Sequence, residues 1–432
     1  MVQALTPTRR KLLGNVIWLY GLQGLNYLVP LAVLPYLVRT LGIERYGLLA
    51  SAQAFAQYFT AFTDYGFNLS ATKKIALIRH SGDQVSRLFW AVILIKAGLM
   101  AVGALILTPL LILVPHFRAD APVYAVAYLA VVGGVLFPLW LFQGMEQMRY
   151  ISIASGGAKA LSAVLIFILV RHPSDYLLAL GLQSGGILVA GIVGFSSALA
   201  SFNISFCSVT REDLRQVLRD GWHLFVSNAA ATLYTNTYVF LVGILAGYTQ
   251  AGYFSAAEKL TRAMIGVLGP VTQTVFPHIS VLVGQSRDMA MRFLRKSLAW
   301  IAVLSFIPSA LLLVFARPIA LVLFASRAEG SVSTLRWIAL LPFALAISSI
   351  FAIQTMIPFG LEKQLSRIYI FAGFSSLACA IPAISRFGSP GAGACLMGVE
   401  IVVIGLMWVV LKRHGIDLLH SASPYPAGQV LS

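Results

Sequence analysis

Long apolar runs alternate with short polar connections along the whole chain. A membrane-spanning helix needs about 20 mainly apolar residues, and twelve segments of the sequence meet that requirement. The connections are too short for a folded extramembrane domain, so the pattern predicts an all-α polytopic membrane protein. The twelve expected spans are residues 13–38, 46–66, 88–114, 122–142, 150–170, 176–200, 222–246, 252–280, 298–324, 335–357, 367–385 and 389–411.

Four of these spans carry polar side chains along one helical face. In the second span, Gln53, Gln57, Thr60 and Asp64 recur at intervals that place them on one side of a helix. Unpartnered polar groups in hydrocarbon cost several kcal/mol each, so we expect the four faces to meet across a water-filled central cavity. The shorter stripes consist of Gln23, Asn26, Tyr27 and Pro30 in the first span, Asn228, Thr232 and Thr235 in the seventh, and Glu258 and Arg262 in the eighth.

A weak internal repeat relates the two halves of the chain. With a shift of 205 residues, Gly42 aligns with Gly247 and Gly47 with Gly252. Six spans lie in each half, so the repeat is parallel, about an axis along the membrane normal. The sequence therefore predicts two six-helix bundles around a central cavity. Their boundaries are residues 1–210 and 211–432.

Basic residues fix the expected orientation. Most of the 31 Lys and Arg residues fall at the termini and in alternate connections, which places both termini and those connections in the cytoplasm. In one of them, "TREDLRQVLRDGW" begins with a capping-box pattern at Thr210 and Asp213 and predicts a short helix on the membrane surface, whose expected role is to connect the two halves. The alternate connections are residues 67–87, 143–159, 201–221, 284–297 and 358–367.

Ionisable residues within the spans are candidates for function. In "GYFSAAEKLTRAMIG" (252–266), Glu258 and Arg262 stand one turn apart and can pair, while Lys259 can reach toward the outer interface. Intramembrane charges usually mark substrate or ion paths, although a Glu–Arg clip that only fastens the bundles is the alternative.

Three further ionisable residues have simpler alternatives. Lys96 is expected to reach back to the cytoplasmic interface, and Asp64 is either a loop-anchoring carboxylate or a site residue. Glu400, near the middle of the last span, is expected to be neutral in hydrocarbon. It is either an ion-coupling group or a structural, hydrogen-bonded glutamic acid.

Composition narrows the class of protein. The chain is 59% hydrophobic and 11% charged, whereas a soluble domain carries about 25% charged residues. The net charge of +16 is dispersed over the connections, so we expect no nucleic-acid partner. The spacing of Cys207, Cys379 and Cys395 predicts neither a disulfide nor a metal site. The sequence lacks a phosphate-binding GxxxxGK[ST] motif, and we expect no cofactor.

Four stretches carry a resemblance to a known family: "LPYLVRTLG" (34–42), "YGLLASAQAF" (46–55), "DYGFNLSATKKIA" (64–76) and "AGYFSAAEK" (251–259). They resemble the Wzx-type polysaccharide repeat-unit flippases of the multidrug/oligosaccharidyl-lipid/polysaccharide exporter superfamily. The resemblance implies a transporter, not an enzyme. It would move undecaprenyl-pyrophosphate-linked oligosaccharide across the inner membrane by alternating access, coupled to an ion, for O-antigen or exopolysaccharide synthesis. A polysaccharide polymerase and a chain-length regulator are the implied protein partners.

Such cargo needs positive charge for its phosphates and amides or hydroxyls for its sugars. Alternatives are a cation-coupled multidrug exporter of the same superfamily, a lipid-II-type flippase, and a membrane polymerase or glycosyltransferase. The sequence contains neither the long outer loop expected of a polymerase nor the Asp-x-Asp site expected of a glycosyltransferase, which argues against a membrane enzyme. The expected cavity residues are Gln23, Asn26, Gln53, Gln57, Asp64, Asn228, Glu258, Lys259 and Arg262, with Glu400 as the ion-coupling candidate.

Overall fold

A computed structural model describes residues 7–324 and 329–418. Over this part of the chain every regular element is helical, as the sequence predicts. The first half supplies α1 (Pro7–Leu41), α2 (Ile43–Asp64), α3 (Phe67–Ile78), α4 (Gly82–Leu113), α5 (Pro115–Ala119), α6 (Ala121–Leu136), α7 (Leu139–Gly144), α8 (Met148–Ile151), the π-helical turn η1 (Ser152–Gly156), α9 (Gly157–Leu169), the 3-10 turn η2 (Pro173–Asp175) and α10 (Tyr176–Ser201).

The second half continues with longer helices. Gly388 interrupts α17 with a φ of 63°, a conformation that glycine adopts without a Cβ clash, at the expected boundary between the last two spans. The elements are α11 (Arg211–Ala246), α12 (Tyr248–Gln285), α13 (Arg287–Val314), α14 (Ala316–Phe324), α15 (Glu329–Ile338), α16 (Leu341–Ser349), the π-helical turn η4 (Ile350–Met356) and α17 (Glu362–Arg413).

Eight helical segments among the described residues are long and apolar enough to cross a membrane. They correspond to the first, third to sixth and ninth to twelfth expected spans, with α17 containing the last two. The other expected spans lie on α2, α11 and α12, and these are helices with polar stripes. The chain is thus a multi-pass membrane protein, and the full count of twelve crossings stays a prediction.

The prediction of a separate surface helix within residues 201–221 is wrong. Its N-cap is correct: the Thr210 hydroxyl accepts from the Asp213 N–H at 3.2 Å, and Thr210 hydrogen bonds lower the pKa of the Asp213 carboxyl. However, α11 runs unbroken from Arg211 to Ala246. Val217 is buried in the apolar core formed by the first half, and Gly221 lies against Tyr65. The apolar face of this segment therefore packs on protein and not on lipid.

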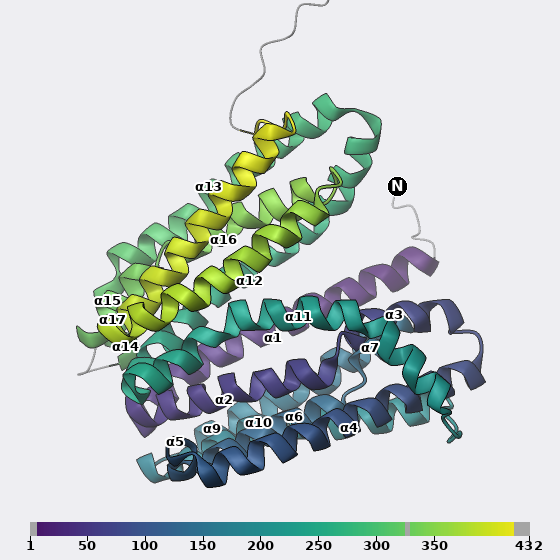
Figure 1. Cartoon of the computed structure of the whole chain (residues 1–432), viewed down its shortest axis with the longest axis horizontal. Helices are drawn as coiled ribbons and strands as arrows, with labels where there is room; N and C mark the ends of the chain where they lie inside the picture. The colour runs from purple at the N-terminus through teal and green to yellow at the C-terminus, as the bar shows by residue number, and fades with distance from the viewer. Residues whose placement is uncertain (1–6, 325–328, 419–432) are drawn as a thin grey trace, which may run out of the picture.

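The apolar interior is divided into three cores. One is shared by both halves and includes Leu34, Ile43 and Phe254. The core around Phe89 is formed by the first half together with the start of α11, including Val217, and the core around Leu294 is formed by the second half. Figure 1 shows the corresponding arrangement: the bundles lie together at the end that holds α5, α14 and α15, and they diverge toward the opposite end. We call these the joined end and the divergent end.

All five expected cytoplasmic connections contribute to the two separate cores and so belong to the divergent end. Residues 67–87, 143–159 and 201–221 contribute to the core of the first half. Residues 284–297 and 358–367 contribute to that of the second. If the charge-based orientation is correct, the divergent end faces the cytoplasm.

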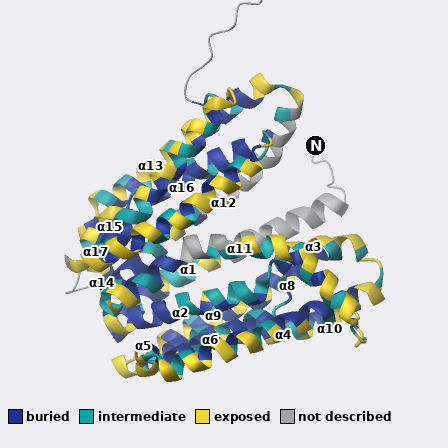
Figure 2. Cartoon of the chain, in the orientation of Figure 1, coloured by how far each residue is buried: buried dark blue, intermediate teal, exposed yellow. Residues whose placement is uncertain are grey.

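Exposed side chains cover the outer faces of both bundles (Figure 2). Many of them are large and apolar, including Leu105 of α4, Trp300 of α13 and Phe374 of α17. A soluble monomer rarely exposes apolar surface so widely. These faces are therefore suited to contact with acyl chains.

Glycines hold the joined end together. A Cβ added to Gly47 of α2 would lie 1.8 Å from the carbonyl oxygen of Tyr248, and one added to Gly252 of α12 would lie 2.5 Å from that of Ile43. The backbones of α2 and α12 thus approach closely because neither residue has a side chain. Gly47 and Gly252 are also the pair aligned by the internal repeat. This reciprocal contact supports the predicted repeat.

Candidate substrate cavity

Two adjoining cavities lie along α2. The first, of about 360 Å³, is enclosed mainly by α1, α2, α9 and α10, and we call it the N-terminal compartment. The second, of about 280 Å³, lies between the halves and is lined by α2, α6, α10, α11 and α12; we call it the central compartment. The residues common to both are Gln53, Thr60, Ile187 and Lys259.

The polar stripe of α2 faces these compartments. Gln53 and Thr60 line both, Gln57 lines the central compartment, and Asp64 lines the N-terminal one. The Gln53 amide donates from Nε2 to Oε1 of Gln183 at 3.0 Å. One helix of 3.6-residue periodicity therefore presents hydrogen-bonding groups to both cavities over about three turns.

On the opposite side, α12 contributes Glu258 and Lys259 to the central compartment. Arg262 donates to Oε1 of Glu258 from both Nη2, at 2.7 Å, and Nε, at 3.0 Å. This ion pair lies within one helix, at positions i and i+4. The Lys259 ammonium lies 5.1 Å from the ring centroid of Tyr46 and lines both compartments. Its side chain therefore serves the cavity and not the outer interface.

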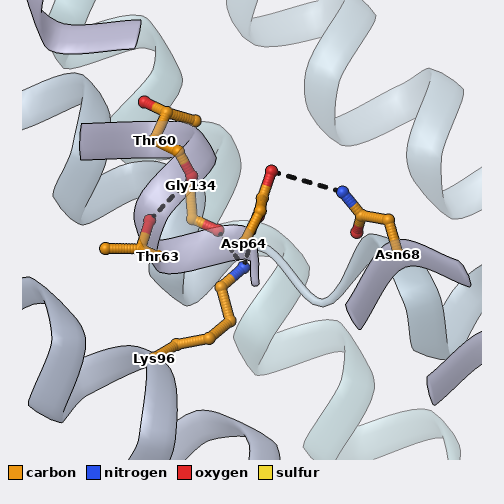
Figure 3. A network of polar contacts seen from close by, with 6 residues as sticks. All are labelled: Thr60, Thr63, Asp64, Asn68, Lys96 and Gly134. Carbon is orange, nitrogen blue, oxygen red and sulfur yellow. Dashed lines mark hydrogen bonds and ion pairs between the residues drawn. The ribbon is translucent and has the colours of Figure 1, made fainter. Parts of the chain in front are cut away.

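The expected position of Lys96 is wrong. Its side chain is only 1% exposed, and Nζ donates to Oδ1 of Asp64 at 3.1 Å and to the carbonyl oxygen of Gly134 at 2.9 Å (Figure 3). Asp64 also accepts from the Asn68 amide at 3.3 Å. The turn after α2 brings Asn68 of α3 back beside the carboxylate. The ammonium group comes from α4, and α6 supplies the carbonyl oxygen that accepts its second hydrogen bond. Asp64 is thus neutralised within the protein wall while one side lines the N-terminal compartment.

The cavities also contain polar residues outside the set expected from the sequence, among them Lys159 and Gln183. Lys159 of α9 lines the N-terminal compartment and donates to Oδ1 of Asn26 at 2.7 Å. Gln183 of α10 holds Gln53, as described above. Lys159 lies where the connection 143–159 overlaps the expected span 150–170, so the sequence alone counts it as a residue of the connection. The apolar run "ALSAVLIFIL" that follows it directly indicates a position at the start of a membrane-spanning helix.

Four other expected residues are not brought into the cavity lining. Arg262 lines neither compartment, although its partner Glu258 lines the central one. Asn26 is exposed on α1, where it accepts the Lys159 bond. Asn228 is exposed on α11 and is absent from the described lining of both compartments. Glu400 is 2% exposed within the core of the second half and lines neither compartment. The side chain of Gln23 lies outside the described residues.

The charge balance of the two compartments is positive. Lys96 is paired with Asp64, and Arg262 with Glu258. Among the described residues, neither Lys159 nor Lys259 lies within ion-pair distance of a carboxylate. The same part of the chain contains no cluster of His, Cys, Asp and Glu suited to a metal ion. The cavities thus combine amides, hydroxyls and two cations that are available to an anion.

Sequence and structure comparisons place this architecture among known proteins. Residues 12–283 match the family described as "Polysaccharide biosynthesis protein". The chain belongs to that family. It is 35% identical over 400 residues to a protein of Escherichia coli (strain K12) named "Putative O-antigen transporter", covering 93% of this chain and 96% of that one.

Two solved structures share the fold. One is the inward-facing conformation of a multidrug resistance MATE family transporter of the MOP superfamily, with a TM-score of 0.69 and 15% identity. The match covers 91% of this chain and 96% of that chain. The other is the lipid II flippase MurJ in an inward closed conformation, with a TM-score of 0.69, 13% identity, and coverage of 93% and 87%.

Proposed function

We propose that the protein is a flippase that moves lipid-linked oligosaccharide repeat units across the inner membrane for surface polysaccharide synthesis. The observation that carries the proposal is the cavity between α2 and α12, in which amides and hydroxyls surround an available cation, Lys259. The membership of the polysaccharide biosynthesis family and the likeness to a protein named as an O-antigen transporter support the same cargo class.

The chemistry of the cavity favours an anionic glycan over a cationic drug. A pyrophosphate-linked sugar, such as the undecaprenyl-pyrophosphate form that the family resemblance implies, presents oxygens that accept from ammonium and amide donors. Lys159 and Lys259 would repel a cation, since the neighbouring carboxylates Asp64 and Glu258 are already held by Lys96 and Arg262. This balance disfavours the multidrug exporter, although the fold is shared. The relatives are named for transport, which favours a transporter over an enzyme.

The arrangement of the bundles suits alternating access. The halves share one core at the joined end and have separate cores at the divergent end. With both termini in the cytoplasm, the protein would receive cargo from the cytoplasmic leaflet and release it after the joined end opens. Ion coupling through Glu400 and cooperation with a polysaccharide polymerase and a chain-length regulator remain part of the proposal.

The test uses a bacterial strain that lacks its own repeat-unit flippase. Expression of this chain, together with the matching glycan pathway, should restore surface polysaccharide. Lys259→Ala should abolish that restoration at an unchanged level of protein in the membrane. Lys363→Ala, which removes an exposed lysine outside both compartments, is the matched control. Full polysaccharide in the Lys259 variant would contradict the proposed role of this cavity.

Separate variants test the Glu258–Arg262 pair. Because Arg262 is paired with Glu258 one turn earlier on α12, removing either charge leaves the other without this partner. Glu258→Ala and Arg262→Ala should both stop export while the protein still reaches the membrane. Normal surface polysaccharide in both would remove the pair from the transport mechanism.

A further inference from the structure

We infer that the two compartments bind the cargo in a fixed order: glycan in the central compartment, phosphates at Lys259 and Lys159, and the first isoprene units in the N-terminal compartment. This inference rests on the proposed function and adds the position of each chemical part. It follows from the way in which the two cavities differ and from the residues that they share.

The central compartment has the chemistry of a sugar site. Its wall contains the amides of Gln53 and Gln57 and the hydroxyls of Thr60, Ser184 and Ser255. Such groups both donate and accept, as sugar hydroxyls do. Its volume lies between the halves, where a head group could leave after the bundles rearrange.

The N-terminal compartment is apolar on the side of α1. Val29, Val33 and Leu37 line it there, and Ala163 and Ile166 of α9 continue the apolar surface. The aliphatic side chains of α1 offer no hydrogen bond to a sugar, and Ser162 is the hydroxyl that lies beside them on α9. This apolar surface suits a branched hydrocarbon, because such a ligand gains binding free energy when its apolar surface is removed from water.

One of the two cations, Lys259, lies where the two kinds of lining meet. Lys259 belongs to both compartments, and Lys159 is in the N-terminal one. Asp64 would repel a phosphate, but Lys96 neutralises it at 3.1 Å. The sequence of apolar wall, ammonium groups and polar chamber repeats the order of isoprenoid, pyrophosphate and sugar in a lipid-linked glycan.

The contact between α1 and α9 indicates how the carrier chain reaches lipid. Lys159 donates to Asn26 at 2.7 Å, and the Tyr36 hydroxyl lies 3.2 Å from the carbonyl oxygen of Phe167 and 2.6 Å from that of Val170, the residue that follows α9. The lining residues Val29 and Val33 of α1 lie between Asn26 and Tyr36 in sequence. An ammonium group has three donor hydrogens, so Lys159 can hold a phosphate oxygen in addition to Asn26. The hydrocarbon would leave through the α1–α9 contact, inside the first bundle.

Binding of simple probes to the purified full-length protein tests this order. Farnesyl pyrophosphate supplies the charge with an apolar chain, and inorganic pyrophosphate supplies the charge alone. Lys159→Gln should weaken both about tenfold, as expected for a charge-assisted hydrogen bond. Ala163→Phe fills the apolar compartment and should weaken farnesyl pyrophosphate about tenfold while inorganic pyrophosphate binds as before, which also shows that the variant is folded. Lys363→Gln is the control and should change neither.

Two results would overturn the inference. One is equal binding of farnesyl pyrophosphate by the Ala163→Phe variant and the wild-type protein, or equal loss of both probes. The other is displacement of farnesyl pyrophosphate by phosphatidylglycerol at comparable concentration, because the compartment would then be a general site for anionic lipid. Transport of lipid-linked glycan by the reconstituted wild-type protein is measured alongside, so that a failure of the binding order can be distinguished from a failure of the proposed flippase function. With transport intact, either result contradicts only the assigned order. Without transport, the proposed function itself is contradicted.

Discussion

The buried Asp64–Lys96 pair yields the most quantitative prediction. Asp64→Asn removes the carboxylate charge but keeps the shape of the side chain. Lys96 then stays buried, at 1% exposure, with the Gly134 carbonyl as its other described partner. Removing one partner of a buried pair costs about 3–5 kcal/mol because the remaining charge is uncompensated. We expect a loss of that size in the free energy of unfolding.

The reciprocal variant should cost less. Lys96→Met leaves Asp64, which is 23% exposed toward a cavity and still accepts from Asn68. A partly solvated carboxylate with one remaining hydrogen bond should lose about 1–3 kcal/mol. The double variant contains neither charge and should recover most of the loss, since an apolar replacement of a buried pair is often close to neutral.

The assay is denaturant unfolding in detergent micelles, followed by tryptophan fluorescence, for the four proteins of this double-mutant cycle. The expected signature is a larger loss for Asp64→Asn than for Lys96→Met, with strong coupling between them. Small, equal losses that add to within about 0.5 kcal/mol would refute the reasoning. They would mean that Lys96 reaches water at the membrane surface, as its sequence position alone suggests.

Three further variants test the joined end and the coupling residue. Gly47→Ala places a Cβ 1.8 Å from the Tyr248 carbonyl oxygen, so we expect α2 and α12 to separate and the melting temperature to fall; an unchanged value argues against the close crossing. Tyr248→Phe removes a 2.8 Å hydrogen bond to Asp120, worth about 1 kcal/mol, and should increase labelling of a cysteine at Gln53 from the outer side. No increase would mean that this bond does not keep the end closed. Glu400→Gln should slow transport and flatten its dependence on the proton gradient, and an unaltered dependence would exclude Glu400 from coupling.

Local sequence signals anticipated much of the fold. The apolar runs predicted the helices, because length and hydropathy are properties of each segment by itself. The 3.6-residue recurrence from Gln53 to Asp64 predicted which face of α2 meets a cavity. The gap between the last two expected spans coincides with Gly388, where a positive φ interrupts α17.

The same local signals could not predict which side chains contact each other in the folded protein. Whether Lys96 turns to the membrane surface or to Asp64 depends on how α2, α4 and α6 meet, which is a tertiary property. Lys159 and Asn26 are likewise far apart in sequence and are joined only because α1 packs on α9. Continuity of α11 follows from the burial of Val217 against the first half, which no pattern within the segment reveals.

Water accessibility of Gln57 tests the central claim most directly. In a variant without Cys207, Cys379 and Cys395, a cysteine at Gln57 and one at the exposed Leu105 of α4 should be compared. A membrane-impermeant thiol reagent added to the cytoplasmic face of inverted vesicles should label the Gln57 position and leave the Leu105 position unlabelled. Failure to label Gln57, or equal labelling at both positions, would contradict a wet chamber between α2 and α12 that opens at the divergent end.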